Sequence, residues 1–205
     1  MLTINSYGIQ QATTESPKGS NTATIWTKNF TLLCLANLSL FISIQMLLPT
    51  LPLYVIHIGG SQQHVGYVMG AYTISCLLMR PFAGWLLDHF GRKPFAVLGL
   101  MLLFAFSLPY FFATGILSLT AIRFVHGLAF GLVSTTLSTM VADSLPIRHL
   151  GEGMGYFGLT TSLSMSLAPM LGLFLTEKFG YRGLFAAICL MAALAFFISL
   201  PVKDR

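Results

Sequence analysis

Six long apolar stretches run through this chain of 205 residues, and they constrain its fold more than any other feature. Each stretch is close to or longer than the ~20 residues with which an α-helix crosses ~30 Å of hydrocarbon. The stretches lack the alternation of barrel strands, and inside lipid a helix pairs its own backbone groups. The sequence therefore predicts an all-α membrane protein with six transmembrane helices. These lie at about residues 30–56, 65–87, 95–113, 117–141, 154–175 and 183–201.

The composition fits a chain covered mainly by lipid, because 55% of its residues are hydrophobic and only 8% are charged. Its 11 Lys and Arg residues are scattered, so nucleic-acid binding is not expected. Cys34, Cys76 and Cys189 lie in three different apolar stretches, which predicts free thiols and no metal site. No cofactor and no enzymatic activity are expected, since the stretches hold no acid pair for proteolysis and no GxSxG element.

Basic residues between the stretches set the expected orientation, because they collect on the cytosolic side of a membrane. With alternating crossings, seven basic residues fall on the side of the termini and two, Lys178 and Arg182, on the other. Both termini are therefore predicted to be cytosolic in a multi-pass protein, with the plasma membrane as its expected location. Residues 1–28 are polar and predicted to form a disordered cytosolic tail, residues 29–202 the bundle, and residues 203–205 the start of a cytosolic loop or the C-terminus.

The sequence also repeats itself once. Pro81, Gly84 and Leu87 recur 88 residues later as Pro169, Gly172 and Leu175, and similar matches continue through the next helices at an offset of 90. Each unit would contain three crossings, an odd number, so the second unit would lie upside down relative to the first. Chance similarity between Leu/Ala/Phe-rich helices is the alternative explanation. Inverted repeats are typical of secondary transporters.

The turn after the second stretch carries an ordered set of glycines and charges. Gly84, Asp88, Gly91, Arg92 and Lys93 form the pattern GxxxDxxGRK, with Gly91 suited to a tight turn and Asp88 to helix-end N–H groups or a neighbouring cation. This pattern resembles the loop between the second and third helices of the major facilitator superfamily, GxxxD(R/K)xG(R/K)(R/K), with His89 in place of a basic residue.

Two further motifs carry the same resemblance, which covers residues 30–205. Arg123 and His126 lie in a pattern similar to the family's fourth-helix motif, with His126 where Gln is commoner. Pro169 and Gly172 retain part of the fifth-helix antiporter motif. The resemblance implies half of a major facilitator fold, closest to drug:proton antiporters, and a conformational role for the Asp88 loop.

Arg123 is the strongest candidate within a predicted helix. A cation there costs ~2.5–3.5 kcal/mol on insertion scales, so it should face the bundle interior or a cavity, with snorkelling outward as the alternative. The resemblance implies a role in proton coupling. His126 shares its face and has either a cavity role or a packing role. Arg80 is expected to snorkel toward the cytosol or to pair there.

Other polar and small residues predict helix contacts. Asn37 and Gln45 in the first helix are candidates either for a solute cavity or for hydrogen bonds between helices. Gly127 and Gly131 lie on one strip of the fourth helix with Thr135 and Ser138, which favours close helix packing.

Three interpretations of the whole chain stay open. It is the amino-terminal half of an efflux-type secondary transporter of small molecules, working by alternating access with a second half or as a homodimer; a truncated product that does not transport; or a membrane scaffold. No Asp or Glu lies within an apolar stretch, so proton coupling would need an acid elsewhere, or His126 in its place.

Overall fold

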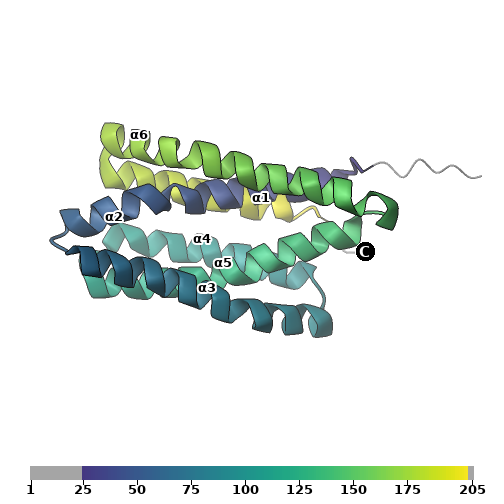
Figure 1. Cartoon of the computed structure of the whole chain (residues 1–205), viewed down its shortest axis with the longest axis horizontal. Coiled ribbons are helices and arrows are strands. Elements are labelled where there is room, and N and C mark those ends of the chain that lie inside the picture. Colours follow the sequence, from purple (N-terminus) through teal and green to yellow (C-terminus); the bar gives the residue numbers. More distant parts are fainter. Residues whose placement is uncertain (1–24, 203–205) are drawn as a thin grey trace, which may run out of the picture.

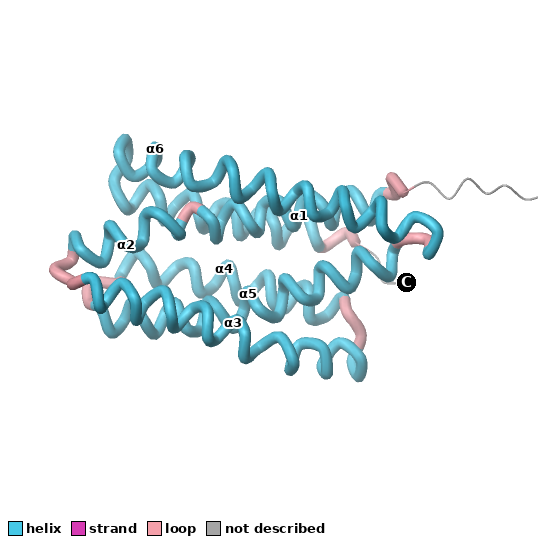
Figure 2. The backbone as a smooth tube through the Cα atoms, in the orientation of Figure 1, coloured by secondary structure: helices cyan, strands magenta, loops and turns pink. Residues whose placement is uncertain are grey.

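The computed structural model describes residues 25–202, and in this range the chain is helical with no β-strand (Figures 1 and 2). The predictions for residues 1–24 and 203–205 lie outside the described residues. The helices in chain order are α1 (Lys28–Gln45), α2 (Leu47–His57), α3 (Gln62–Phe90), α4 (Lys93–Ser107), the 3-10 helix η1 (Leu108–Phe112), α5 (Ile116–Ser144), the 3-10 helix η2 (Ile147–His149) and α6 (Leu150–Ser199).

Local sequence explains where these helices begin and end. Thr27 caps α1 by accepting a hydrogen bond from the N–H of Phe30 at 3.2 Å. Gly91 ends α3 with φ +86°, a left-handed conformation that favours glycine. Gly180, at φ +66°, is non-helical inside α6 and divides it into two helices joined by a kink. In Figure 1 the chain doubles back there, and the two parts of α6 lie side by side.

Within residues 25–202, four segments are long and apolar enough to cross a membrane: Lys28–His57, Lys93–Phe112, Ile116–Ser144 and Ile147–Ser199. The first joins α1 to α2, and the last contains both parts of α6. Helix α3 is as long as α5 but is not among the four, since it carries Arg80 and several polar residues within its apolar part. The all-helical membrane class is thus confirmed, whereas six crossings in two repeats stay a prediction.

Two helix pairs organise the bundle. Helix α3 packs mainly against α5, and α1 packs mainly against α6, while α4 contacts α5 and α6 (Figure 1). The α3–α5 contact is close because Gly127 and Gly131 have no side chain: a Cβ atom at Gly131 would lie 2.7 Å from the carbonyl oxygen of Cys76. This confirms the packing role predicted for the two glycines.

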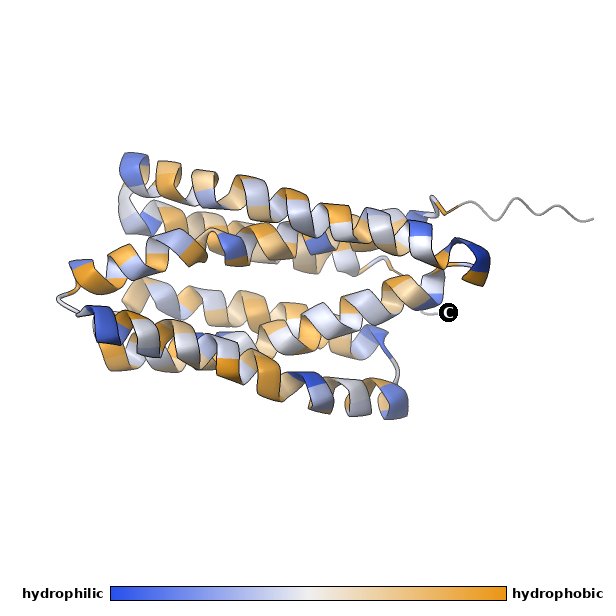
Figure 3. Ribbon diagram, viewed as in Figure 1, coloured by the Kyte–Doolittle hydropathy of each residue, from blue (hydrophilic) through white to orange (hydrophobic). Residues whose placement is uncertain are grey.

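Apolar side chains form the core along the whole length of the bundle, and apolar residues also cover much of its outside (Figure 3). Ile25 and Val202, at the two ends of the described chain, belong to one hydrophobic cluster. The described chain therefore begins and ends at the same end of the bundle.

Candidate functional site

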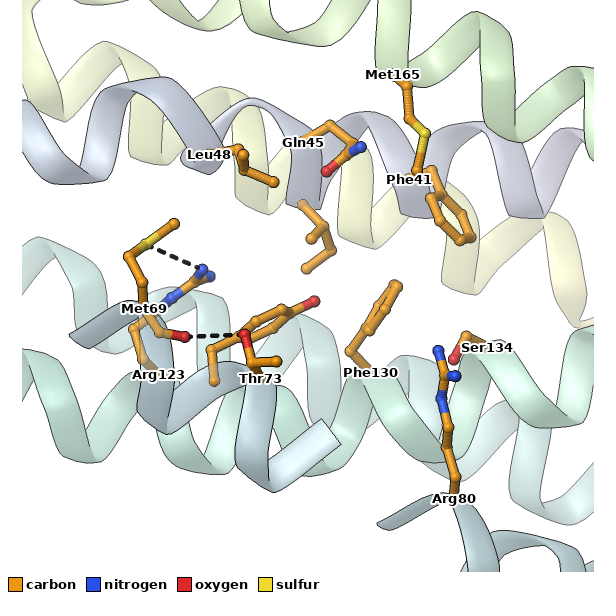
Figure 4. A pocket seen from close by; sticks show the side chains of 12 residues that line it. Phe41, Gln45, Leu48, Met69, Thr73, Arg80, Arg123, Phe130, Ser134 and Met165 are labelled. Carbon is orange, nitrogen blue, oxygen red and sulfur yellow. Dashed lines mark hydrogen bonds between the residues drawn. The ribbon is translucent and has the colours of Figure 1, made fainter. Parts of the chain in front are cut away.

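A cavity of about 400 Å³ lies between the two helix pairs (Figure 4). Helices α1, α2, α3 and α5 supply most of its wall, and α6 adds one methionine. The lining residues are Phe41, Ile44 and Gln45 from α1, Leu48 from α2, Met69, Tyr72, Thr73 and Arg80 from α3, Arg123, Phe130 and Ser134 from α5, and Met165 from α6.

The wall of this cavity is mostly apolar and carries an unbalanced charge. Phe41 and Phe130 meet edge to face across it, with ring centroids 5.4 Å apart. Arg80 and Arg123 are its only charged lining residues among the described part of the chain, and no Asp or Glu is present there. A mainly apolar cavity with a few polar groups is the usual form of a small-molecule site.

Arg123 is the central polar group of the wall. Its side chain is buried, with 1% of the residue exposed, and its guanidinium carbon lies 4.1 Å from the centroid of the Tyr72 ring. Nη2 donates a weak hydrogen bond to Met69 Sδ at 3.9 Å, and Nε and Nη1 have no hydrogen-bond partner within residues 25–202. The arginine faces the interior, as predicted, and does not snorkel outward.

His126 lies behind this wall and does not line the cavity. Its Nδ1 is 3.1 Å from the hydroxyl oxygen of Tyr110, and the ring is fully buried. Nε2 has no partner in the described part of the chain. Of the two roles left open for His126, the position matches packing beside the site.

The structure separates the two cavity candidates of α1. Gln45 lines the cavity. Asn37 is buried away from it, and its side-chain amide donates hydrogen bonds to Thr160 Oγ1 at 2.8 Å and Thr161 Oγ1 at 3.0 Å on α6. Asn37 therefore joins two helices, which was the second of its predicted alternatives.

The charged loop after α3 is at the bundle end, remote from the cavity wall. Arg92 Nε pairs with Asp143 Oδ2 at 2.9 Å, a partner at the end of α5 that sequence reasoning missed. Asp143 follows the fourth apolar stretch by two residues, and the position of this acid was the sequence signal that could have indicated the ion pair. Asp88 is exposed, Gly84 has open space beside it, Gly91 makes the turn, and Lys93 begins α4.

Pro169 and Gly172 both lie in the first part of α6, where their motif was expected. A Cβ atom at Gly172 would lie 2.7 Å from the carbonyl oxygen of Met46, the residue that separates α1 from α2. Gly172 thus permits α6 to approach the break in the first span.

The cavity brings Arg123 and Gln45 together with residues that the sequence analysis did not assign to it. Tyr72, Met69 and Phe41 were not singled out, and Arg80 was expected at the cytosolic side. On each helix the lining residues recur at helical spacing, so the sequence indicated which residues share one face of a helix. It did not indicate which faces of different helices meet.

Comparison with known proteins places this arrangement in a family. The sequence pattern of the Major Facilitator Superfamily matches residues 33–205. Multidrug resistance protein 2 of Bacillus subtilis is 30% identical over 174 residues, covering 80% of this chain and 43% of that protein. Quinolone resistance protein NorA of Staphylococcus aureus is 27% identical over 165 residues, covering 78% of this chain and 41% of that protein.

A solved structure shares the fold. The human organic anion transporter MFSD10 (TETRAN) superposes with a TM-score of 0.66 at 22% identity, over 87% of this chain and 49% of that one. The chain spans about two fifths of the length of the curated relatives named above. Because the family pattern covers most of its residues, the chain belongs to the Major Facilitator Superfamily.

Proposed function

We propose that this chain is one six-helix half of a secondary transporter that moves small, largely hydrophobic molecules across a membrane by alternating access. The observation that carries the proposal is the cavity between the helix pairs, with an apolar wall and a buried arginine. Family membership, a multidrug resistance relative and coverage of 49% of a transporter structure support it.

The helix contacts support two inverted three-helix units. Hydrogen bonds from Asn37 to Thr160 and from Ser164 to the carbonyl oxygen of Leu38 join the first span to the first part of α6. The first span of one unit thus packs against the second span of the other unit. The symmetric contact is that between α5, the first span of the second unit, and α3, the second span of the first unit. A twofold axis that exchanges the units would interchange these two pairs.

The proposal counts α3 and both parts of α6 as crossings. Helix α3 has 29 residues, more than the ~20 that a span needs, and it exposes a row of large apolar side chains. These are Tyr67, Ile74, Leu77, Leu78, Phe82 and Trp85. Gly180, with its positive φ, then lies in the turn between the two parts of α6, which are the fifth and sixth crossings.

A second half would close the solute path, either as another six-helix bundle or as a second copy of this chain. In this arrangement the termini are cytosolic, as the distribution of basic residues predicts, and the membrane is the plasma membrane. The loop of Asp88 and Arg92 changes partners between conformations, and Asp143 holds Arg92 in the state described. If protons drive transport, Arg123 and His126 are the candidate coupling groups.

Counterflow in proteoliposomes tests the proposal. Two preparations would be compared: this chain alone, and the chain expressed with any polypeptide that is encoded in frame after residue 205. A fluoroquinolone is the probe, since one relative is named for quinolone resistance. We expect saturable counterflow that is reduced in Asp88→Asn and Arg123→Ala, while the exposed control Arg182→Gln retains it.

Membrane insertion must be checked in the same samples by the accessibility of tags at the two termini. Loss of transport with normal insertion places the defect in function. Absence of saturable counterflow in both preparations, with insertion intact, would contradict the proposal and favour a truncated product or a scaffold.

A further inference from the structure

Unpartnered buried polar atoms collect at one place in residues 25–202. They are Tyr72 Oη, Arg123 Nε, Arg123 Nη1 and His126 Nε2; the remaining such atom, Arg92 Nε, faces Asp143 in an ion pair. The Tyr72 ring connects the three residues, 4.1 Å from the Arg123 guanidinium carbon and 6.5 Å from the His126 ring. Because most buried polar groups in proteins are paired, this cluster indicates a missing polar partner.

The chemistry of the cluster specifies the partner. A guanidinium has only donors, and its adjacent N–H groups match the two oxygens of a carboxylate. The hydroxyl of Tyr72 can donate a further hydrogen bond. Both Arg123 and Tyr72 line the cavity, and their unpartnered atoms are covered in the state described, so a bound molecule would present its acceptor to both after a small shift of these side chains.

The charge of the cavity points in the same direction. Arg80 contributes a second positive charge to the wall, and no described lining residue is an acid. Arg123 contacts the Tyr72 ring, Met69 Sδ and the Tyr110 side chain, but it has no acidic partner in the described part of the chain. A buried cation without a counter-ion is costly in a low-dielectric setting, so a negative group that pairs with Arg123 removes that cost. A lipophilic cation would add to the positive charge.

The remaining wall suits an aromatic body. Phe41, Phe130, Leu48 and Met165 provide apolar surface around a volume of about 400 Å³, which fits one small molecule. The acidic group and the aromatic body would thus occupy different parts of one cavity.

We infer that the solutes of this cavity are small aromatic molecules that carry a carboxylate, held by Arg123 and Tyr72 with Arg80 adding attraction. The inference rests on the proposed function and specifies its substrate class. It predicts discrimination by charge between molecules of the same shape.

Three pyrene compounds of similar size test this: pyrenebutyrate, pyrenebutanol and pyrenebutylamine. Their binding to the 205-residue chain in phosphatidylcholine nanodiscs is measured by equilibrium dialysis, with empty nanodiscs subtracted. We expect the carboxylate to bind about ten- to a hundredfold more tightly than the alcohol, as for hydrogen bonds between charged groups, and the amine to bind most weakly.

Variants locate the effect. Arg123→Gln should remove about ten- to a hundredfold of the carboxylate's affinity and leave that of the alcohol within about twofold, which also reports an intact cavity. Tyr72→Phe keeps the ring over the guanidinium and should weaken the carboxylate about two- to tenfold. Arg182→Gln, an exposed arginine at the Gly180 turn, should change neither.

Equal affinity for carboxylate and alcohol, or tighter binding of the amine, would overturn the inference and leave the transporter proposal standing. The inference would also be overturned if Arg123→Gln lowered the affinities for the carboxylate and the alcohol equally while Tyr72→Phe changed neither affinity. Binding of none of the three compounds would contradict the solute cavity itself, and with it the proposed function.

Discussion

Replacing Gly127 by alanine should destabilise the bundle, although alanine is the better helix former. Gly127 lies on α5 where that helix meets α3. A Cβ atom there would lie 2.5 Å from the carbonyl oxygen of Tyr72 and would collide with Ser75 Oγ. The carbonyl belongs to helical backbone and cannot rotate away, so the whole helix must move.

The size of the effect follows from that contact. Ordinary van der Waals contact begins at 3.4 Å, so α3 and α5 must separate locally by about 0.9 Å from the 2.5 Å approach. Overpacking of this kind costs ~1–3 kcal/mol. The control is Gly66→Ala on α3, where a Cβ atom meets nothing within 4 Å. There we expect a gain of ~0.4–1 kcal/mol from the lost freedom of the unfolded chain.

The free energy of unfolding of both variants can be measured by detergent titration followed by far-UV circular dichroism. The double variant Gly127→Ala with Ser75→Ala refines the test: removing the hydroxyl should restore only part of the stability, because the Tyr72 carbonyl stays in place. If Gly127→Ala is as stable as Gly66→Ala, the close α3–α5 contact is not present in the membrane.

Three further perturbations test other parts of the bundle by the same titration. Asn37→Leu should cost ~1–2 kcal/mol through the lost hydrogen bonds to Thr160 and Thr161, and no extra loss is expected when both threonines are already alanine. Gly91→Ala should cost ~1–3 kcal/mol because φ +86° with ψ 170° is a backbone conformation found almost only at glycine, whereas Gly84→Ala, with open space beside it, should not destabilise. Asp143→Asn should cost at most ~1 kcal/mol, and less at high salt, because both members of its pair with Arg92 are partly exposed; a larger, salt-independent loss would contradict this.

The ends of helices were predictable where the sequence contains a residue, such as a glycine at a turn, that interrupts a helix. The predicted break between residues 175 and 183 falls at Gly180, whose positive φ divides α6. The predicted turn at Gly91 is present for the same reason. Helix α3 extends beyond the predicted 65–87 to Gln62–Phe90, because a helix continues into polar residues past the apolar stretch that revealed it.

Pairing between helices was not predictable to the same degree. Asn37 and Gln45 are eight residues apart, which places them about 80° apart around one helix at about 100° per residue. One therefore contacts α6 while the other faces the cavity. Both residues have polar amide side chains, so their chemistry does not distinguish them. Only the position of the neighbouring helices decides which one forms hydrogen bonds between helices and which one lines the cavity.

Arg80 shows what helical geometry alone could have added. It follows Met69 by eleven residues and Thr73 by seven, so all three lie within about 40° on one stripe of α3. Arg123 and Phe130 are seven residues apart and share a stripe of α5 in the same way. Gly127, midway between them, sets α5 against α3. Once that contact is fixed, both stripes can border one cavity, and Arg80 lines it together with Arg123. The unbalanced charge of the cavity is therefore a consequence of helix packing, which no single apolar stretch could reveal.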